Sequence, residues 1–277
     1  MTPDLYCVVG NPVDHSKSPW IHARFAELTS QNLRYGRRLI PLDGFAHSIE
    51  AFRHEGGKGC NITVPFKFEA APIATRLSAR AELAQACNVL MFDGPEIFAD
   101  NTDGIGLVED IRRNAGVDLA GRDLLLIGAG GASCGVLGPL IEAGPRRIVV
   151  ANRTRPKAAS LAERHAALAR DHGVELGARG LDEVHDAFDV VVNATASSLA
   201  GAGVPVDARV LKRGALAFDM MYGPAVQGFL DWASEHGAVP RDGLGMLVEQ
   251  AAEAFLIWRG VRPPSAQVLA ELRATGA

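Results

Sequence analysis

A glycine-rich segment follows a short apolar run near the middle of this 277-residue chain. Residues 124–127 are Leu-Leu-Leu-Ile, a pattern typical of a strand that is buried on both faces of a parallel sheet. Residues 128–131, Gly-Ala-Gly-Gly, come next, and residues 132–143 carry the apolar stripe of a helix. A strand, a glycine turn and a helix in this order present backbone N–H groups to a pyrophosphate. The segment predicts a dinucleotide site, although Ser133 stands where a third glycine is usual.

The end of the next apolar run, residues 147–151, indicates which dinucleotide would bind. Asn152-Arg-Thr-Arg155 follows it directly. A unit that binds NAD usually has an acidic residue here, which bonds the ribose 2′-hydroxyl. This chain has no acid at that place, and its two arginines suit the 2′-phosphate of NADP, because a guanidinium can bind a phosphate through two hydrogen bonds. A basic loop facing solvent is the alternative, but the glycine turn upstream favours cofactor binding.

Polar residues that could bind a substrate or take part in catalysis also occur in the first third of the chain. Ser16 and Ser18 lie beside a predicted helix N-terminus and suit a carboxylate. Ser18 could instead be a helix N-cap, with Pro19 in the first helical position, and the sequence leaves both interpretations open. Lys67 follows the predicted strand 60–64, at the strand end where open α/β sheets place their sites. An ordinary surface lysine is the alternative.

A cluster of two acids and an amide, Asp100-Asn-Thr-Asp-Gly104, precedes another predicted helix. Thr102 or Asp103 can cap that helix, but the cluster exceeds what capping needs and suits hydroxyl binding or acid–base chemistry. Residues 193–195, Asn-Ala-Thr, end a further apolar run and suit an inner ribose and a nicotinamide. Gln250 lies on a long predicted helix, where a solvent-facing role is the alternative.

Composition limits the classes of protein to consider. The chain is 48% hydrophobic and 22% charged, which is typical of a soluble globular protein. Its net charge of −4 provides no basic field for nucleic acid or an anionic membrane. Because no apolar run approaches 20 residues and the N-terminus lacks a basic region before an apolar core, we expect no membrane span and no secretory signal. The scattered histidines predict no metal site, and four cysteines without a CxxC pair suit buried thiols in the reducing cytoplasm.

The order of the predicted elements indicates an α/β protein with two α/β domains. Residues 1–104 form the first domain, and residues 105–242 form a Rossmann-like dinucleotide-binding domain. Two helices in residues 243–277 cannot bury a core alone, so we expect them to complete the first domain. Within this outline, the glycines of residues 56–59 are interpreted as a turn and residues 158–169 as a single helix.

Taken together and in this order, the motifs resemble those of the shikimate dehydrogenase family, NADP-dependent enzymes of chorismate and aromatic amino-acid biosynthesis. The resemblance covers nearly the whole chain. Departures from the family's usual pattern occur at Ala79, Val89, Cys134 and Ala196-Ser-Ser198, and none removes a proposed catalytic group. The motifs that carry the resemblance are Gly10-Asn-Pro, His15-Ser-Lys-Ser-Pro19, Asn61-Ile-Thr-Val-Pro-Phe-Lys67, Asn88, Asp100-Asn-Thr-Asp-Gly104, Gly128-Ala-Gly-Gly-Ala132, Asn152-Arg-Thr154, Asn193-Ala-Thr195, Asp219-Met-Met-Tyr222 and Asp242-Gly-Leu-Gly-Met-Leu247.

The resemblance implies reversible reduction of 3-dehydroshikimate to shikimate by NADPH, in an N-terminal substrate-binding domain with Lys67 and Asp103 as the catalytic acid–base pair. It implies no metal. The implied carboxylate contacts are Ser16, Ser18 and Tyr222, and the implied ring-hydroxyl contacts are Thr63, Asn88, Asp103 and Gln250, with Lys67 also touching the substrate. The implied cofactor contacts are Gly128, Ala129, Gly130, Gly131, Ala132, Asn152, Arg153, Thr154, Lys157, Ala194, Thr195, Met220, Gly243 and Met246.

Rival interpretations remain within the same chemistry. One is a paralogue that acts on quinate, or on both quinate and shikimate, with broader substrate or NAD use; another is an aminoshikimate-type dehydrogenase. Ser16 and Ser18, together with Arg153, favour shikimate and NADP. A non-catalytic NADP-binding regulator on this fold would be expected to lack Lys67 or Asp103, and both are present. A homodimer and a monomer both stay open.

Overall fold

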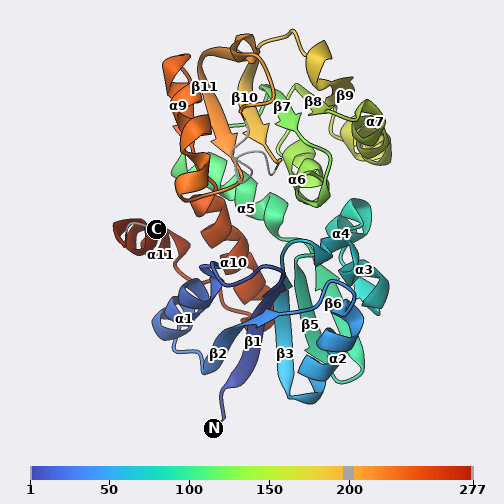
Figure 1. The fold of residues 1–277 in the computed structure, drawn as a ribbon, viewed down its shortest axis with the longest axis vertical. Helices are drawn as coiled ribbons and strands as arrows, with labels where there is room; N and C mark the ends of the chain where they lie inside the picture. The colour runs from blue at the N-terminus through green and yellow to red at the C-terminus, as the bar shows by residue number, and fades with distance from the viewer. Residues whose placement is uncertain (1, 196–202, 276–277) are drawn as a thin grey trace. The chain divides into compact units, whose positions relative to one another are not determined.

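The computed structural model describes residues 2–195 and 203–275. The chain divides into two compact units, Met1–Gly106 with Leu247–Ala277, and Leu107–Met246. Each unit is built on its own six-stranded sheet (Figure 1). Within the described ranges, no helix has the length and apolar character needed to cross a membrane.

The first unit has a mixed sheet with the strand order β2-β1-β3-β5-β6-β4. Strand β1 runs parallel to β2 and β3, while β5 is antiparallel to β3 and β6, and β4 is parallel to β6. Its strands are β1 (Asp4–Gly10), β2 (Leu33–Leu39), β3 (Gly57–Ile62), β4 (Arg76–Leu77), β5 (Val89–Asp93) and β6 (Glu96–Asp100). Its helices are α1 (Ser18–Leu28), α2 (Phe45–His54), η1 (Phe66–Phe68), α3 (Ala70–Ile73), α4 (Ala79–Ala84), the start of α5 (Asp103–Glu109), most of α10 (Leu244–Arg259) and α11 (Ser265–Ala274).

Alternating side chains divide the core of this unit between the two faces of its sheet. Cys7 and Val9 of β1 pack in a cluster that contains Phe45 of α2. Tyr6 and Val8 of the same strand pack in a second cluster, which contains residues of α10. This alternation follows from the two-residue period of a strand. Both faces of the sheet are therefore covered by helices. The polar residues of the candidate site, Lys67, Asn88 and Asp103, lie next to the ends of strands.

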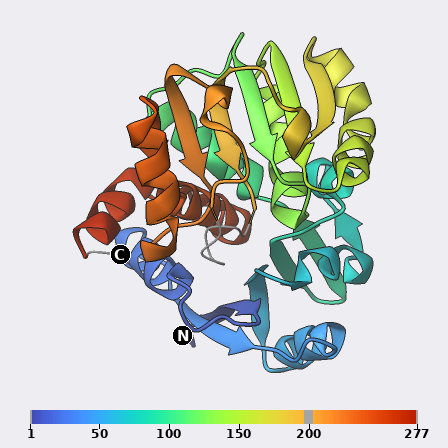
Figure 2. The ribbon, with the colours of Figure 1, turned by 45° about the horizontal axis from the view of Figure 1, so that its top comes forward.

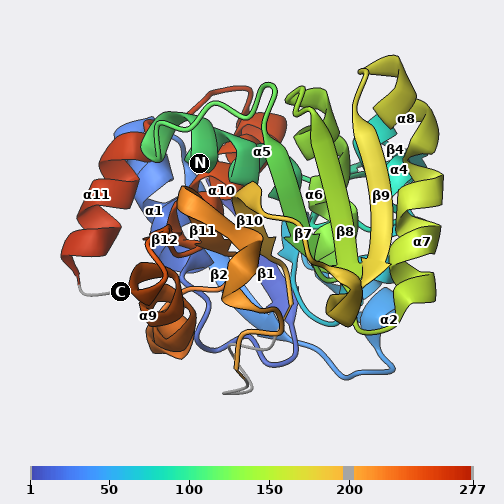
Figure 3. The same ribbon diagram turned by 90° about the horizontal axis from the view of Figure 1, so that it is seen from above.

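The second unit has an all-parallel sheet with the order β12-β11-β10-β7-β8-β9, and Figure 3 shows β11 to β9 side by side. Figure 2 shows the same sheet from another side, with the green strand β7 in its interior. This is the doubly wound order of dinucleotide-binding folds. The strands are β7 (Asp123–Ile127), β8 (Arg147–Asn152), β9 (Glu175–Gly180), β10 (Phe188–Asn193), β11 (Leu211–Asp219) and β12 (Val239–Arg241). The helices include the π-helical segment η2 (Asp110–Asn114), α6 (Gly131–Glu142), α7 (Arg155–Arg164), α8 (Ala166–Asp171) and α9 (Gln227–Glu235).

Two local predictions are wrong. The glycines of residues 56–59 do not form only a turn, because β3 already begins at Gly57. A Cβ at Gly59 would lie 2.5 Å from the Leu90 carbonyl oxygen, so close packing explains that glycine better than turn geometry does. Residues 158–169 belong to two helices, α7 and α8, which meet at the buried His165.

Candidate active site and cofactor site

Lys67 and Asp103 form an ion pair in the first unit. Lys67 lies on the short helix η1 that follows β3, and Asp103 is the first residue of α5. The Lys67 Nζ atom donates to Asp103 Oδ2 at 2.5 Å, and the two side chains are only 18% and 7% exposed. An ammonium held this way can give a proton to a substrate oxygen and accept it back, while the carboxylate keeps the lysine oriented. The surface-lysine alternative for Lys67 is therefore wrong.

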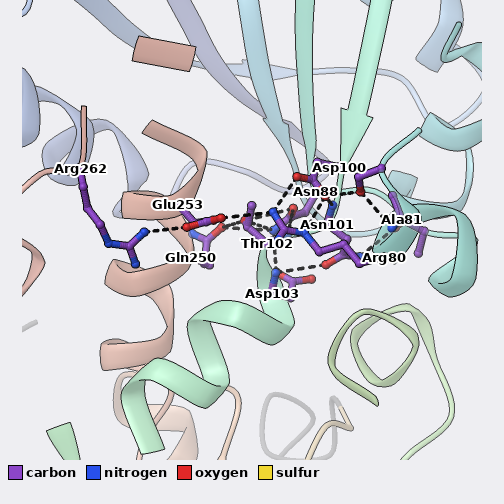
Figure 4. A network of polar contacts seen from close by, with 12 residues as sticks. Arg80, Ala81, Asn88, Asp100, Asn101, Thr102, Asp103, Gln250, Glu253 and Arg262 are labelled. Atoms are coloured by element: carbon purple, nitrogen blue, oxygen red, sulfur yellow. Dashed lines mark hydrogen bonds and ion pairs between the residues drawn. The ribbon is translucent and has the colours of Figure 1, made fainter. Parts of the chain in front are cut away.

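Asn88 connects this ion pair to two other polar residues. Its Nδ2 atom donates to Asp103 Oδ1 at 2.8 Å and lies 3.2 Å from Gln250 Oε1. Its Oδ1 atom accepts from the Thr102 backbone N–H at 2.8 Å. Asn88 and Gln250 are 2% and 8% exposed, so the solvent-facing alternative for Gln250 is also wrong. Figure 4 shows the cluster between the end of β6, the start of α5 and α10.

The N-terminus of α5 is not capped as expected. Instead of Thr102 or Asp103, Asn101 accepts the Asp103 backbone N–H on its Oδ1 atom, at 3.1 Å. The Thr102 hydroxyl is directed to Asn88 Oδ1, 3.2 Å away. Because Asn101 performs the capping, the side chains of Thr102 and Asp103 are available for the polar cluster.

Ser16 and Ser18 lie together at the start of α1. The Ser16 hydroxyl donates to the Ser18 hydroxyl at 3.2 Å, and the Ser18 backbone N–H bonds Ser16 Oγ at 3.3 Å. Ser18 is not an N-cap, because α1 already begins at Ser18 and no side chain caps it. Arg37 fixes this turn by donating to the Ser16 carbonyl oxygen at 2.6 and 3.1 Å. Two clustered hydroxyls beside a helix N-terminus can hold an anion.

Thr63 joins the strand ends of this unit through its backbone. Its N–H bonds the Val9 carbonyl oxygen at 2.9 Å, and its carbonyl oxygen accepts from Phe66 N–H at 3.1 Å. A Cβ at Gly10 would lie 2.4 Å from the Thr63 methyl group. A residue larger than glycine at position 10 would therefore displace the Thr63 side chain. Thr63 lies four residues before Lys67, on the segment that carries the lysine from β3.

The second unit carries the glycine turn, in which residues 128–132 join β7 to α6. Gly128 has φ +113°, a backbone conformation that favours glycine, and its N–H bonds the Ala151 carbonyl oxygen at 2.7 Å. No side chain in the described ranges caps α6, so its first N–H groups have no side-chain acceptor among those residues. A Cβ at Gly130 would meet nothing within 4 Å, which means that the backbone here borders open space. These features suit a pyrophosphate.

Basic side chains gather where β8 ends. Arg153 and Lys157 are exposed, and neither forms an ion pair with a residue in the described ranges. Arg155, the second arginine of this segment, instead pairs with Glu183, with 3.4 Å between Nε and Oε2. The Asn152 side chain donates to the Thr154 carbonyl oxygen at 3.0 Å and shapes the turn into α7. The strand end thus offers two uncompensated cations.

The ends of β10 and β11 are tied together by buried side chains. Asn193 Nδ2 donates to Asp219 Oδ2 at 2.9 Å, and the Thr195 hydroxyl donates to Asn193 Oδ1 at 2.7 Å. Asp219 Oδ1 accepts the Met221 backbone N–H at 2.8 Å. Ala194 and Met220 of the same segments are buried, as is Met246 on α10, and Tyr222 is half-buried.

Gly243 packs directly against this segment. A Cβ at Gly243 would lie 2.3 Å from the Met220 carbonyl oxygen, so no larger residue fits there without movement. Its N–H bonds the Met221 carbonyl oxygen at 2.8 Å. The glycine therefore allows the start of α10 to approach the end of β11.

Two buried residues for which no role was predicted, Tyr35 and Asn61, lie next to Asn88 in the first unit. The Tyr35 hydroxyl donates to Asn61 Oδ1 at 2.6 Å, and Asn61 Nδ2 donates to the Asn88 carbonyl oxygen at 3.2 Å. Burial raises the pKa of Tyr35 well above its ordinary value, so the hydroxyl stays a donor. The sequence feature that could have indicated this role is Asn61 itself, a polar residue in the buried half of strand β3. Among the described residues, no three His, Cys, Asp or Glu side chains are arranged to hold a metal ion.

Comparisons with known proteins agree with this architecture. Residues 8–90 match the shikimate dehydrogenase substrate binding domain, residues 110–203 the shikimate/quinate 5-dehydrogenase family, and residues 243–273 the shikimate 5′-dehydrogenase C-terminal domain. A shikimate dehydrogenase (NADP(+)) of Acidovorax ebreus is 66% identical over 271 residues, which are 98% of this chain and 96% of the relative.

Solved structures give the same result. A Thermus thermophilus shikimate 5-dehydrogenase in complex with NADP(H) and shikimate has a TM-score of 0.85 at 30% identity, covering 98% of this chain and 99% of that one. An Ael1 enzyme from Pseudomonas putida has a TM-score of 0.89 at 47% identity, covering 97% and 98%.

The doubly wound sheet, its glycine turn and the basic end of β8 define an NADP-dependent oxidoreductase with two α/β units. The chain belongs to the shikimate dehydrogenase family. The predictions of the α/β fold class, of the family and of an NADP-dependent oxidoreductase acting on a CH–OH group are therefore confirmed.

Proposed function

We propose that this chain interconverts 3-dehydroshikimate and shikimate with NADPH and NADP⁺, and that Lys67 and Asp103 are its acid–base pair. The observation that carries the proposal is the 2.5 Å contact between Lys67 Nζ and Asp103 Oδ2, next to the Asn88 and Gln250 amides. A ring that carries several hydroxyls needs donors and acceptors close to the reacting carbon, and this cluster offers both.

In the proposed mechanism, NADPH supplies the hydride that reduces the ketone carbon. Lys67 stabilises the charge that develops on the ketone oxygen and donates a proton to it; in the reverse direction the neutral amine accepts the proton. Asp103 orients the ammonium through the hydrogen bond that it accepts from Lys67 Nζ. Asn88, Thr63 and Gln250 bind the ring hydroxyls, and the Ser16 and Ser18 hydroxyls hold the carboxylate.

The residues of the second unit fit NADP in chemical type. The glycine turn, residues 128–132, would hold the pyrophosphate, since within the part of the chain that the structure describes its backbone is open at Gly130 and α6 has no side-chain cap. Arg153 and Lys157, with Asn152 and Thr154, would surround the 2′-phosphate, because no acid ends β8 and both cations lack an ion-pair partner in the described ranges. Ala194, Thr195, Met220, Gly243 and Met246 would line the nicotinamide end.

Four parallel assays test this function: initial rates with shikimate and with quinate, each with NADP⁺ and with NAD⁺. We expect activity with shikimate and NADP⁺ and much lower rates in the other three. Comparable rates with quinate would favour the quinate rival, for which the name of the matched shikimate/quinate family is the specific observation. No activity in any assay would favour the regulator hypothesis.

The cellular setting follows from the same chemistry. All four cysteines are buried free thiols, which supports a reducing cytoplasm as the location. We propose Tyr222 as a further substrate residue, and either a monomer or a homodimer as the oligomeric state. The sedimentation coefficient of the purified protein distinguishes the two states.

A further inference from the structure

A chain of ion pairs borders the polar cluster of the first unit. Arg80 donates to both carboxylate oxygens of Asp100, at 2.7 and 2.6 Å, and its Nη2 atom lies 3.3 Å from Glu253 Oε1. Arg262 in turn contacts the second oxygen of Glu253 at 2.6 Å. Figure 4 shows that this chain runs from α4 through the end of β6 to α10. None of these four residues has a role in the proposed reaction.

One end of the ion-pair chain fixes the segments that carry Asn88 and Asp103. The Asp100 Oδ1 atom accepts the Asn101 backbone N–H at 2.7 Å and also a hydrogen bond from the Ser78 hydroxyl. Asn101 then caps Asp103, and the Asp100 carbonyl oxygen accepts the Asn88 backbone N–H at 3.0 Å. Asp100 is 3% exposed, so these contacts are protected from water. Its position therefore determines where the Asn88 backbone lies.

The other end of the chain fixes α10. Glu253 follows Gln250 by three residues, which places the two side chains on the same face of the helix. Gln250 reaches Asn88 across 162 residues of sequence, through a hydrogen bond of 3.2 Å between neutral groups. Such a bond between neutral groups contributes only modestly to holding the two amides together. The Arg80–Glu253 pair acts between the same two parts of the unit, and its side chains are only 24% and 16% exposed.

We propose that Arg80 and Glu253 are positioning residues, whose ion pair sets the spacing between the Asn88 and Gln250 amides and thereby the affinity for the substrate ring hydroxyls. The inference rests on the proposed function, because it takes these amides as hydroxyl-binding groups. The two arginines and two carboxylates balance in charge, so the chain can be partly buried without an uncompensated charge.

The main test is Glu253→Gln, which keeps the side-chain volume and removes the charge. We expect the KM for shikimate to rise by about three- to tenfold, with kcat changed less than about twofold and the KM for NADP⁺ unchanged. Arg262→Gln, which leaves the Arg80 contact intact, is expected to raise the KM for shikimate by about twofold. The matched control is Glu271→Gln, which removes a 2.7 Å ion pair with Arg24 and should leave both KM values unchanged.

A double-mutant cycle distinguishes positioning from a general loss of stability. In a Gln250→Ala background, adding Glu253→Gln should raise the KM for shikimate by less than about twofold, because its effect acts through Gln250. Its effect on the melting temperature should be the same in both backgrounds. An unchanged KM for shikimate in Glu253→Gln, or an equal rise in both backgrounds, would overturn the positioning role while wild-type activity leaves the proposed function standing. A wild-type protein inactive with shikimate would instead overturn the proposed function and the inference with it.

Discussion

The two units build their candidate sites in different ways. In the first unit, side chains from η1, α5, α10 and the residue before β5 bond one another, and Asn88 meets Gln250 across 162 residues of sequence. In the second unit, the candidate cofactor site consists mainly of short contiguous segments. These are a glycine turn and a strand end with two cations that lack ion-pair partners in the described ranges. The first site depends on the packing of a whole unit, whereas the second depends on local backbone conformation and charge. Substitutions should therefore affect the two sites in different ways.

The largest expected effect separates catalysis in the first unit from cofactor binding in the second. Lys67→Ala should lower kcat by about 10²- to 10⁴-fold, the usual contribution of a general acid–base group. NADP⁺ affinity, measured by fluorescence titration, should stay within about twofold of the wild type, since the proposed cofactor residues belong to the other unit. Lys58→Ala, at an exposed lysine of β3, is the matched control. Normal turnover in Lys67→Ala would refute the acid–base assignment.

The contrast between the units also explains what the sequence could predict. The buried strands β7 and β10 and the turn after β7 were predicted correctly, because their signals are continuous in sequence. Strands β9 and β12 were missed: they lie at the two edges of the sheet, and the sequence Glu-Leu-Gly-Ala-Arg-Gly of β9 lacks an apolar run.

In the first unit, the site residues were proposed mainly from the family resemblance, and local signals misled. Ser18 and Thr102 have types that favour N-caps, yet their hydroxyls are not used for capping. The competing cap for α5, Asn101, was not distinguishable from its neighbours in sequence. Helical periodicity places Gln250 on α10, but it cannot specify a hydrogen bond to Asn88, because that contact depends on tertiary packing.

Acid should destabilise the first unit more than the second. His22 is fully buried and stacked on Tyr35 at 4.2 Å, and neither of its ring nitrogens has a hydrogen-bond partner among the described residues. Burial lowers the pKa of His22 to about 3, and the nearby Asn61 side chain opposes this only in part. Buried His165 of the second unit also has a lowered pKa, through burial, but its ring bonds the Leu161 carbonyl oxygen at 3.0 Å.

The sign of the effect follows from proton binding. Between pH 6.5 and 3 the unfolded His22 binds a proton that the folded one does not, so stability falls as the pH falls through this range. At pH 5 the loss should be about 2 kcal/mol relative to pH 7.5. His22→Phe should remove this part of the pH dependence in urea unfolding, while the control His47→Gln, at an exposed histidine, should not. Parallel pH profiles for His22→Phe and the wild type would contradict the expectation.

The 2′-phosphate assignment predicts a smaller effect, confined to the second unit. Arg153→Ala should raise the KM for NADP⁺ by about tenfold, since a charge-assisted hydrogen bond to a phosphate is worth about 1.5 to 3 kcal/mol and solvent screens part of it. The rate with NAD⁺ and the KM for shikimate should not change. A KM for NADP⁺ within twofold of the wild type would leave the basic strand end without its proposed role.

The smallest effect is expected at Arg155, which the family resemblance does not place among the cofactor contacts. By residue type alone, both Arg153 and Arg155 suit the 2′-phosphate. In the structure Arg155 is paired with Glu183 at 3.4 Å, with both side chains largely exposed. Arg155→Ala should therefore change the KM for NADP⁺ by less than about twofold, because an exposed ion pair contributes little and the cation is already compensated. Glu183→Gln separates the alternatives further: if Arg155 is held away from the cofactor by Glu183, releasing it should lower the KM for NADP⁺ slightly. A tenfold rise in Arg155→Ala would show that the arginine leaves Glu183 for the phosphate, and that local charge outweighs the ion pair in this unit.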